Sequence, residues 1–314
     1  MELAKSIKKP KKNANKIKGN LWQVYSLAAI PLLLLFVFNY IPMFGIIIAF
    51  KDYRYDKGIF GSDWIGLDNF KVFLNSNDAL NVTKNTILLN ILFIALGIIA
   101  AVLVAILLYE LTSRKATKVY QTVLITPHFL SWVVVGSMVY AILHPTSGLL
   151  NSILRTFGMQ NIDWYSTPGA WPAILAIASV WKNVGMDSVL YYASLMSIDS
   201  SLFEAAELDG ATRAQKNRYI MIPHLTSLIV MLSILKIGNI FRADFGLFYQ
   251  LTRDSGALYD ATDVMDTYIF RTMRVVGDYG LSGAMGLIQS VVGMCLVLLV
   301  NWITNKIEPE NALF

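Results

Sequence analysis

Long apolar runs alternate with shorter polar segments along the whole of this chain. Each run holds enough apolar residues to cross about 30 Å of hydrocarbon as an α-helix. The runs lie near residues 21–49, 86–109, 122–143, 172–194, 225–248 and 282–303. This pattern predicts an all-α, polytopic membrane protein with six transmembrane helices. A break or tilt is expected in the first helix near Pro42, because proline removes a helical hydrogen bond.

The distribution of basic residues predicts how these helices are oriented. With the N-terminus inside, the cytosolic segments carry 14 of the 26 Lys and Arg residues, and the external segments carry nine. Because basic residues concentrate in cytosolic loops, both termini are expected in the cytosol. The chain then divides into a basic cytosolic tail at 1–20, a first transmembrane helix at 21–50, an extracellular segment at 51–84, a transmembrane core at 85–305 and a cytosolic C-terminal tail at 306–314.

Composition independently places the chain in a bilayer. With 55% hydrophobic and 15% charged residues among 314, and a mean hydropathy of +0.53, it has too little polar surface for a soluble domain. Seven lysines before Gly19 account for most of the net charge of +5, so this charge does not indicate nucleic-acid binding. They are expected to orient the first helix and to contact anionic membrane lipid. The single Cys295 excludes an intrachain disulfide.

No motif in the sequence indicates catalysis or nucleotide binding. The phosphate-binding pattern G-x-x-x-x-G-K-[ST] is absent, so a partner would have to bind ATP. The histidines His128, His144 and His224 are scattered over different segments, without the spacing of a metal site. We therefore expect a chain that is not an enzyme and that binds neither a cofactor nor a metal itself.

The polar segment between the fourth and fifth runs predicts two short helices joined at a glycine. An S-x-x-E pattern at 201–204 is typical of a helix start, and Gly210 can adopt the left-handed conformation that ends a helix. A T-x-x-Q pattern at 212–215 repeats the start, and Pro223 is expected to end the second helix. We expect residues 199–224, the cytosolic loop, to dock another protein.

The cytosolic loop also resembles a signature of transport proteins. Its pattern is E-A-A, three residues, Gly, nine residues, Ile, one residue, an aliphatic residue and Pro, and residues 204–223 fit at every position. The signature is that of permease subunits of bacterial ABC importers. The rest of the chain after the basic tail resembles the LplB-type carbohydrate permeases in particular, through the passages 40–52, 121–135 and 266–271.

This resemblance implies a MetI-like transmembrane core and a function in carbohydrate uptake. The chain would form half of the pathway for an oligosaccharide in a bacterial plasma membrane, opposite a second homologous permease. Two cytosolic ATP-binding subunits, which hold ATP and Mg, and an extracellular lipid-anchored solute-binding protein would complete the importer. The residues implied in coupling to the ATPase are Glu204, Ala205, Ala206, Asp209, Gly210, Ala211, Ile220 and Pro223.

Polar side chains within the fourth and fifth runs are candidates for lining the pathway. An ionised side chain at mid-membrane costs roughly 2.5–3.5 kcal/mol, so each lysine there should face a partner or a wet cavity. Three polar residues recur every third position from Lys236 and would form a stripe on a helix, which suits a polyhydroxylated solute. We favour a cavity for Lys236 and Asn239. The candidate pathway residues are Trp132, Lys182, Asn183, Asp187, Lys236, Asn239 and Arg242.

Simpler explanations exist for several of these residues. Lys182 would pair with Asp187, and Arg242 and Asp244 would lie at the outer interface, which we favour for these two. The carboxylate of Glu204 would cap its own helix, contact a partner, or do both. The slight excess of positive charge within the spans permits, as a hypothesis, a substrate that bears carboxylates.

Aromatic residues also admit two explanations. Trp132, Trp181, Tyr191 and Tyr192 could stack on sugar rings, although packing between helices is the commoner role. The aromatic-rich extracellular segment could dock a binding protein or mark the membrane interface.

A secondary transporter driven by an ion gradient is the main alternative function. It could also use six helices with charges at mid-membrane, but the sequence shows no inverted repeat of broken helices. An intramembrane enzyme is disfavoured further, because paired catalytic residues are missing.

Overall fold

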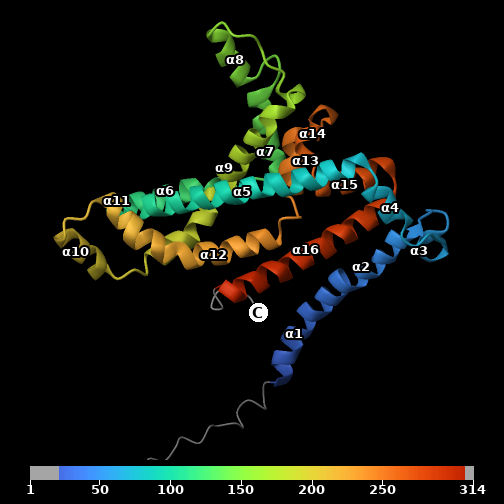
Figure 1. The fold of residues 1–314 in the computed structure, drawn as a ribbon, viewed down its shortest axis with the longest axis horizontal. Coiled ribbons are helices and arrows are strands. Elements are labelled where there is room, and N and C mark those ends of the chain that lie inside the picture. Colours follow the sequence, from blue (N-terminus) through green and yellow to red (C-terminus); the bar gives the residue numbers. More distant parts are fainter. Residues whose placement is uncertain (1–20, 308–314) are drawn as a thin grey trace, which may run out of the picture.

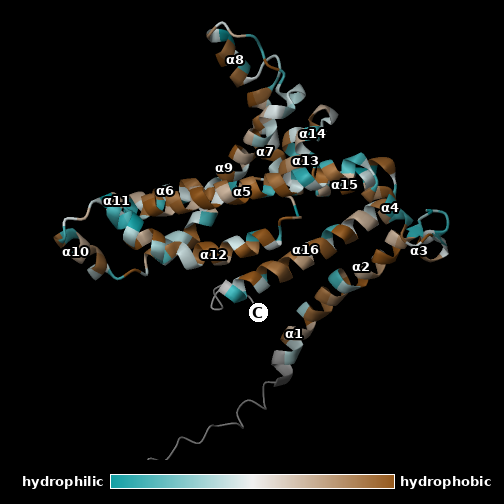
Figure 2. Ribbon diagram, in the orientation of Figure 1, coloured by the Kyte–Doolittle hydropathy of each residue, from teal (hydrophilic) through white to brown (hydrophobic). Residues whose placement is uncertain are grey.

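A computed structural model describes residues 21–307 of the chain (Figure 1), so the predicted basic tail and most of the C-terminal tail lie outside the described residues. Five helical stretches are long and apolar enough to cross a membrane, or six when one bent pair is counted as a single span. The prediction of an all-α polytopic protein is confirmed. Figure 2 shows hydrophobic residues along most of the long helices and hydrophilic residues near α11 at one end and α3 at the other.

The first span runs through Pro42 without interruption. It consists of α1 (Leu21–Leu35), the π-helical η1 (Phe36–Tyr40), α2 (Ile41–Met43) and the 3-10 helix η2 (Phe44–Phe50). The N–H of Ile41 bonds to the carbonyl of Phe36, five residues back. This wider turn directly precedes Pro42 and accommodates its ring, so the helix changes type where a break or tilt was expected.

The predicted extracellular segment begins with a small cap beside the end of the first span. Two-residue strands β1 (Lys51–Asp52) and β2 (Asp63–Trp64) pair antiparallel, and the short helices α3 (Gly58–Gly61) and α4 (Asp68–Leu74) follow each strand in turn. The rings of Phe50 and Trp64 stack with centroids 5.7 Å apart. At least part of the aromatic content is therefore used for packing within this cap.

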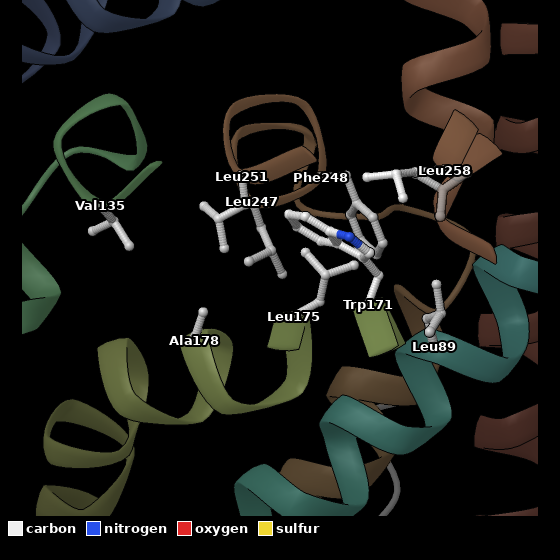
Figure 3. Packing of buried hydrophobic residues seen from close by; sticks show 10 residues of the cluster. Leu89, Val135, Trp171, Leu175, Ala178, Leu247, Phe248, Leu251 and Leu258 are labelled. Carbon is white, nitrogen blue, oxygen red and sulfur yellow. The ribbon is translucent and has the colours of Figure 1, made fainter. Parts of the chain in front are cut away.

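Three spans match the predicted positions. They are α5 (Asn77–Tyr109), which starts earlier than predicted after a cap by Ser76, α9 (Trp171–Leu195) and α16 (Tyr279–Ile307). Figure 3 shows the main core, where buried side chains of α5, α7, α9 and α13 converge. Trp171 and Leu175 of α9 pack here against Phe248 and Leu251, all of them essentially inaccessible to solvent. This core holds the N-terminal half of α9 against the short helix α13.

The predicted helix over 122–143 is not continuous in the structure. The chain forms α6 (Arg114–Ile125), η3 (Thr126–Phe129) and α7 (Trp132–Leu143), and the two parts are bent by 96°. Pro127 lacks an N–H for the helical ladder, and Ser131 is extended and caps α7 through the N–H of Val134. Hydropathy does not distinguish such a bent pair from one span.

The fifth span differs from its prediction at both ends. One helical stretch of 26 residues runs from Arg213 to Gly238 through α11 (Arg213–Lys216), η6 (Asn217–Met221) and α12 (Ile222–Gly238). Pro223 therefore does not end the second loop helix. As before Pro42, a π turn directly precedes the proline, with the N–H of Ile222 bonded to the carbonyl of Asn217. The predicted continuation to residue 248 is wrong, because the helix ends at Gly238.

The remaining elements connect the spans. The cytosolic loop contains α10 (Ser200–Leu208), and the other connecting elements are α8 (Leu149–Thr156), η4 (Trp164–Ser166), η5 (Pro168–Ala170), α13 (Phe245–Thr252), η7 (Gly256–Leu258), α14 (Tyr259–Thr262), α15 (Met265–Arg271) and η8 (Thr272–Val276). In Figure 1, α10 and α11 lie at the opposite end of α5 from α4 and α15.

Candidate functional site

The first helix of the cytosolic loop is capped by Asp199, which the sequence analysis did not single out. Its carboxylate accepts the N–H of Ser201 at 3.0 Å, so the helix starts before the predicted S-x-x-E pattern, and the predicted capping role of Ser201 with Glu204 is wrong. This backbone hydrogen bond lowers the pKa of Asp199. Glu204 is exposed, and its carboxylate forms no hydrogen bond or ion pair with any residue from 21 to 307. Its carboxylate is thus available to a partner.

The turn at Gly210 has the predicted left-handed conformation, with φ of +74°. The N–H of Gly210 donates to Glu207 at 3.0 Å, and the N–H of Ala211 donates to Ala206 at 2.9 Å. These two bonds form the Schellman motif, which satisfies the last carbonyls of α10. A residue with a Cβ atom would be strained here.

Side-chain bonds hold the second loop helix against the first and against α5. The predicted capping box of Thr212 and Gln215 is confirmed. Lys216 forms an ion pair with Glu207 at 2.7 Å, and this hydrogen bond lowers the pKa of Glu207. Asn217 donates to Glu110, which follows α5, at 2.7 Å. The loop therefore presents a defined surface.

The exposed surface of the loop combines the signature residues with an apolar rim. Glu204, Ala205, Asp209, Gly210 and Pro223 are exposed, and Ala206, Ala211 and Ile220 are half-buried. Leu208 is 91% exposed and Tyr219 is 68% exposed. Neither was among the predicted site residues, although large apolar side chains in a polar segment are a usable signal.

Lys182, a candidate pathway residue, lies buried at the bend of the third span. It is 7% exposed, its Nζ donates to the carbonyl of His128 at 2.6 Å, and it lies 5.2 Å from the ring centroid of Trp132. The ring of His128 contacts the side chain of Asn183 at 3.2 Å. The predicted pairing of Lys182 with Asp187 is wrong, because residues five apart point about 140° away from each other on a helix.

Asp187 instead pairs with Lys236 across two spans. Their Oδ2 and Nζ atoms are 2.7 Å apart, and the side chains are 31% and 37% exposed. Together with Asn183 they line a cavity of about 180 Å³ between α9 and α12. The ion pair compensates two charges, each of which would cost free energy if it faced lipid without a partner.

Breaking this pair is expected to destabilise the protein. Lys236→Leu or Asp187→Leu leaves one charge unpaired, and the free energy of unfolding should fall by less than the roughly 2.5–3.5 kcal/mol of a lipid-facing charge, since the cavity hydrates it. The exchanged double variant Lys236→Asp with Asp187→Lys should recover most of the loss. Thermal unfolding in detergent measures all three variants. An exchanged variant no more stable than the single variants would contradict a direct pair.

The chain leaves the helix at residues 239–244, and distant side chains bind the released backbone groups. These bonds are Asn90 to the Ile240 carbonyl at 2.8 Å, Gln289 to the Phe241 carbonyl at 2.6 Å, and the Ala243 N–H to Asp266 at 2.7 Å. The predicted helical stripe is therefore wrong beyond Lys236. Irregular backbone at membrane depth is tolerated where protein buries it or where it lines a wet cavity.

The break nevertheless gathers the same polar residues around cavities. Lys236, Asn239 and Arg242 share a cavity of about 410 Å³ with Asn90. Asn239 and Arg242 also line a second cavity of about 240 Å³ beside Gln289. Polar side chains around such spaces can bind a hydroxylated solute.

The aromatic candidates have different positions. Tyr191 is 2% exposed and Tyr192 packs against its cluster, so the stacking hypothesis is wrong for Tyr191. Trp181 lines an apolar cavity of about 350 Å³. The indole N–H of Trp132 donates to Asp244 at 2.7 Å, and Asp244 also caps α13.

Comparison with known protein families identifies the family of this chain. The model for the family described as "binding-protein-dependent transport system inner membrane component" matches residues 93–311. The chain belongs to this family. The predicted resemblance to permease subunits of such importers is confirmed, and the protein is a membrane-embedded transport subunit.

Relatives of this permease cover nearly its whole length. It is 32% identical to the protein LplB of Bacillus subtilis strain 168 over 295 residues, covering 94% of this chain and 92% of the relative. It is 33% identical over 275 residues to the polygalacturonan/rhamnogalacturonan transport system permease protein YteP of the same organism, covering 88% and 85%.

A solved structure resembles this permease closely in fold. It is described as a bacterial ABC transporter involved in the import of the acidic polysaccharide alginate. The TM-score is 0.83 at 30% identity, covering 93% of this chain and 98% of the matched chain. A second structure of an alginate transporter, in complex with a pentasaccharide-bound periplasmic protein, matches with a TM-score of 0.82 at 30% identity, covering 93% of this chain and 96% of the other.

The sequence analysis of this permease did not predict the side chains that hydrogen-bond to the backbone at residues 239–244. Asn90 and Gln289 are polar residues inside apolar runs, so the cost argument applied to the lysines would have found them. Asp266 opens one of the passages that carry the family resemblance. Their partners are backbone groups more than 20 residues away, which sequence spacing does not indicate.

Proposed function

We propose that this permease is one membrane-spanning half of an ATP-driven importer of oligosaccharides. The observation that carries the proposal is the helical stretch from Arg213 to Gly238, which joins the cytosolic loop to the polar break at 239–244. Movement of the loop would be transmitted directly to the cavities. The names of the relatives, which include polysaccharide transport, support a carbohydrate substrate.

The cytosolic loop supplies the coupling surface in this proposal. Two cytosolic subunits bind ATP and Mg, and their closure on ATP moves the loop. The residues in coupling roles are Glu204, Ala205, Ala206, Asp209, Gly210, Ala211, Ile220 and Pro223. The permease itself performs no covalent chemistry. Both of its termini lie in the cytosol of a bacterium, and the protein spans the plasma membrane.

The first span supports pairing with a second, homologous permease. Every described side chain from Tyr25 to Phe44 is exposed, and most of them are large and apolar. In Figure 1, α1 diverges from the other helices, while η2 contacts the start of α16. Such a helix is suited to pack against a partner within the membrane.

An extracellular lipid-anchored binding protein delivers the oligosaccharide.

ATP dependence tests the proposed function. We expect proteoliposomes that contain the whole importer and its binding protein to accumulate a labelled oligosaccharide only with ATP and Mg inside the cytosolic compartment. Ionophores that dissipate Na⁺ and H⁺ gradients should leave the rate unchanged. Uptake driven by an ion gradient without ATP would instead identify a secondary transporter.

A further inference from the structure

Arg242 is a cation at the break that interacts electrostatically with Asp266, but the hydrogen bonds of its neighbouring carboxylates go to other groups. Asp187 pairs with Lys236, and Asp244 accepts hydrogen bonds from the Trp132 indole and the N–H of its own helix. The Oδ2 atom of Asp266 accepts the N–H of Ala243 at 2.7 Å and the side-chain amide of Gln289 at 3.0 Å.

No ion pair or hydrogen bond of the Arg242 side chain joins it to any residue between 21 and 307. The contrast with Arg271 is informative, because that half-buried guanidinium pairs with both Asp254 and Asp263 and lies over the ring of Tyr259 at 3.9 Å. Arg271 has a structural role, whereas Arg242 keeps all five N–H donors available to a ligand.

The surroundings of Arg242 offer space and further donors. Its side chain is exposed and lines both the cavity of about 410 Å³ and the cavity of about 240 Å³ at the break. The side chain of Asn239 lines the same two cavities and can donate or accept hydrogen bonds. The backbone that carries both residues is held by Asn90 and Gln289, so the two side chains are presented from a fixed segment.

We propose that the guanidinium of Arg242, together with the amide of Asn239, binds the carboxylate of a uronic-acid unit in an acidic oligosaccharide. The inference rests on the proposed function and specifies its substrate class. A planar guanidinium matches a carboxylate with two parallel hydrogen bonds. Binding a carboxylate would break no hydrogen bond or ion pair of Arg242 to the described residues, whereas Lys236 is already paired with Asp187.

Equilibrium binding to the purified, assembled importer without its binding protein tests this site. The probes are tri-galacturonate, its fully methyl-esterified form and glucose 1-phosphate. We expect the wild-type importer to bind the acid at least tenfold more tightly than the ester. Arg242→Gln should weaken binding of the acid at least tenfold and change binding of the ester by less than twofold. Arg242→Lys, which keeps the charge but loses the planar fork, should be intermediate.

Matched controls separate recognition from folding. Arg274→Gln removes an exposed arginine outside the cavities and should change neither affinity. Unchanged binding of the ester shows that Arg242→Gln is folded. Equal affinity for acid and ester in the wild type, a preference that survives Arg242→Gln, or tighter binding of glucose 1-phosphate would each overturn the inference. An importer that takes up oligosaccharides with ATP but shows these results keeps the proposed function, whereas loss of ATP-driven uptake refutes that function instead.

Discussion

Replacing Leu208 with glutamate is expected to lower ATP-driven uptake at least tenfold while the permease remains folded in the membrane. Leu208 is 91% exposed at the end of α10, directly before the Gly210 turn, so a charge there disturbs little within the chain. A protein surface that approaches the small alanines of the loop would bury this side chain, and a buried unpaired carboxylate is costly. Uptake, ATPase stimulation and copurification of the ATPase measure the effect.

The matched control is Leu80→Glu, near the start of α5 and at the end of that helix far from the cytosolic loop. Leu80 is 79% exposed, so the same substitution is made at a similarly exposed leucine that is remote from the cytosolic loop. We expect this variant to retain the ATPase through purification. Normal coupling in Leu208→Glu, or equal loss of the ATPase in both variants, would argue against docking through the end of α10.

Replacing Gly185 with alanine is expected to remove most of the folded protein. A Cβ atom at this position would lie 2.0 Å from the carbonyl oxygen of Leu124 and 2.7 Å from the nitrogen of Ile125. Because these are backbone atoms, α9 and α6 would have to separate. The nearby bonds of Lys182 and Asn183 to His128 would then be strained. Overpacking commonly costs about 1–3 kcal/mol, and a clash with backbone should reach the upper end.

Gly286→Ala provides the control for this prediction. Gly286 lies within α16, and a Cβ atom there would meet nothing within 4 Å. Since alanine favours helix more than glycine does, the variant should be as stable as the wild type or slightly more so. Size-exclusion profiles of fluorescently tagged proteins report the folded fraction. A monodisperse Gly185→Ala protein with wild-type thermal stability would show that the helices are not packed as closely as described.

Much of the architecture could be predicted from the apolar runs, and the errors share a physical cause. Hydropathy depends only on which residues a segment contains. It therefore predicted the positions of α9 and α16 correctly, but it wrongly included residues 239–248 in the fifth helix. That segment leaves the helix because Asn90, Gln289 and Asp266 bind its backbone from other elements. Such compensation depends on contacts far apart in the sequence.

Local motifs were informative where they depended on neighbouring residues alone. Gly210 adopts the expected conformation, and Thr212 with Gln215 forms the expected capping box. The start of α10 was misassigned because Asp199, two residues before the pattern that begins at Ser201, caps the helix instead. Partners of the charged residues were harder to assign, since Lys182 bonds to a carbonyl group and not to a carboxylate.

The π turn before Pro223 has a mechanical consequence. A proline that interrupted the helix would have created a flexible joint, and such a joint would dissipate any rotation applied on the cytosolic side. With the helical ladder preserved, the 26 residues from Arg213 to Gly238 form a rod about 39 Å long. In the proposed function, a rotation of the cytosolic loop would therefore reach Asn239 and Arg242, where the rod ends and the backbone is held by Asn90 and Gln289.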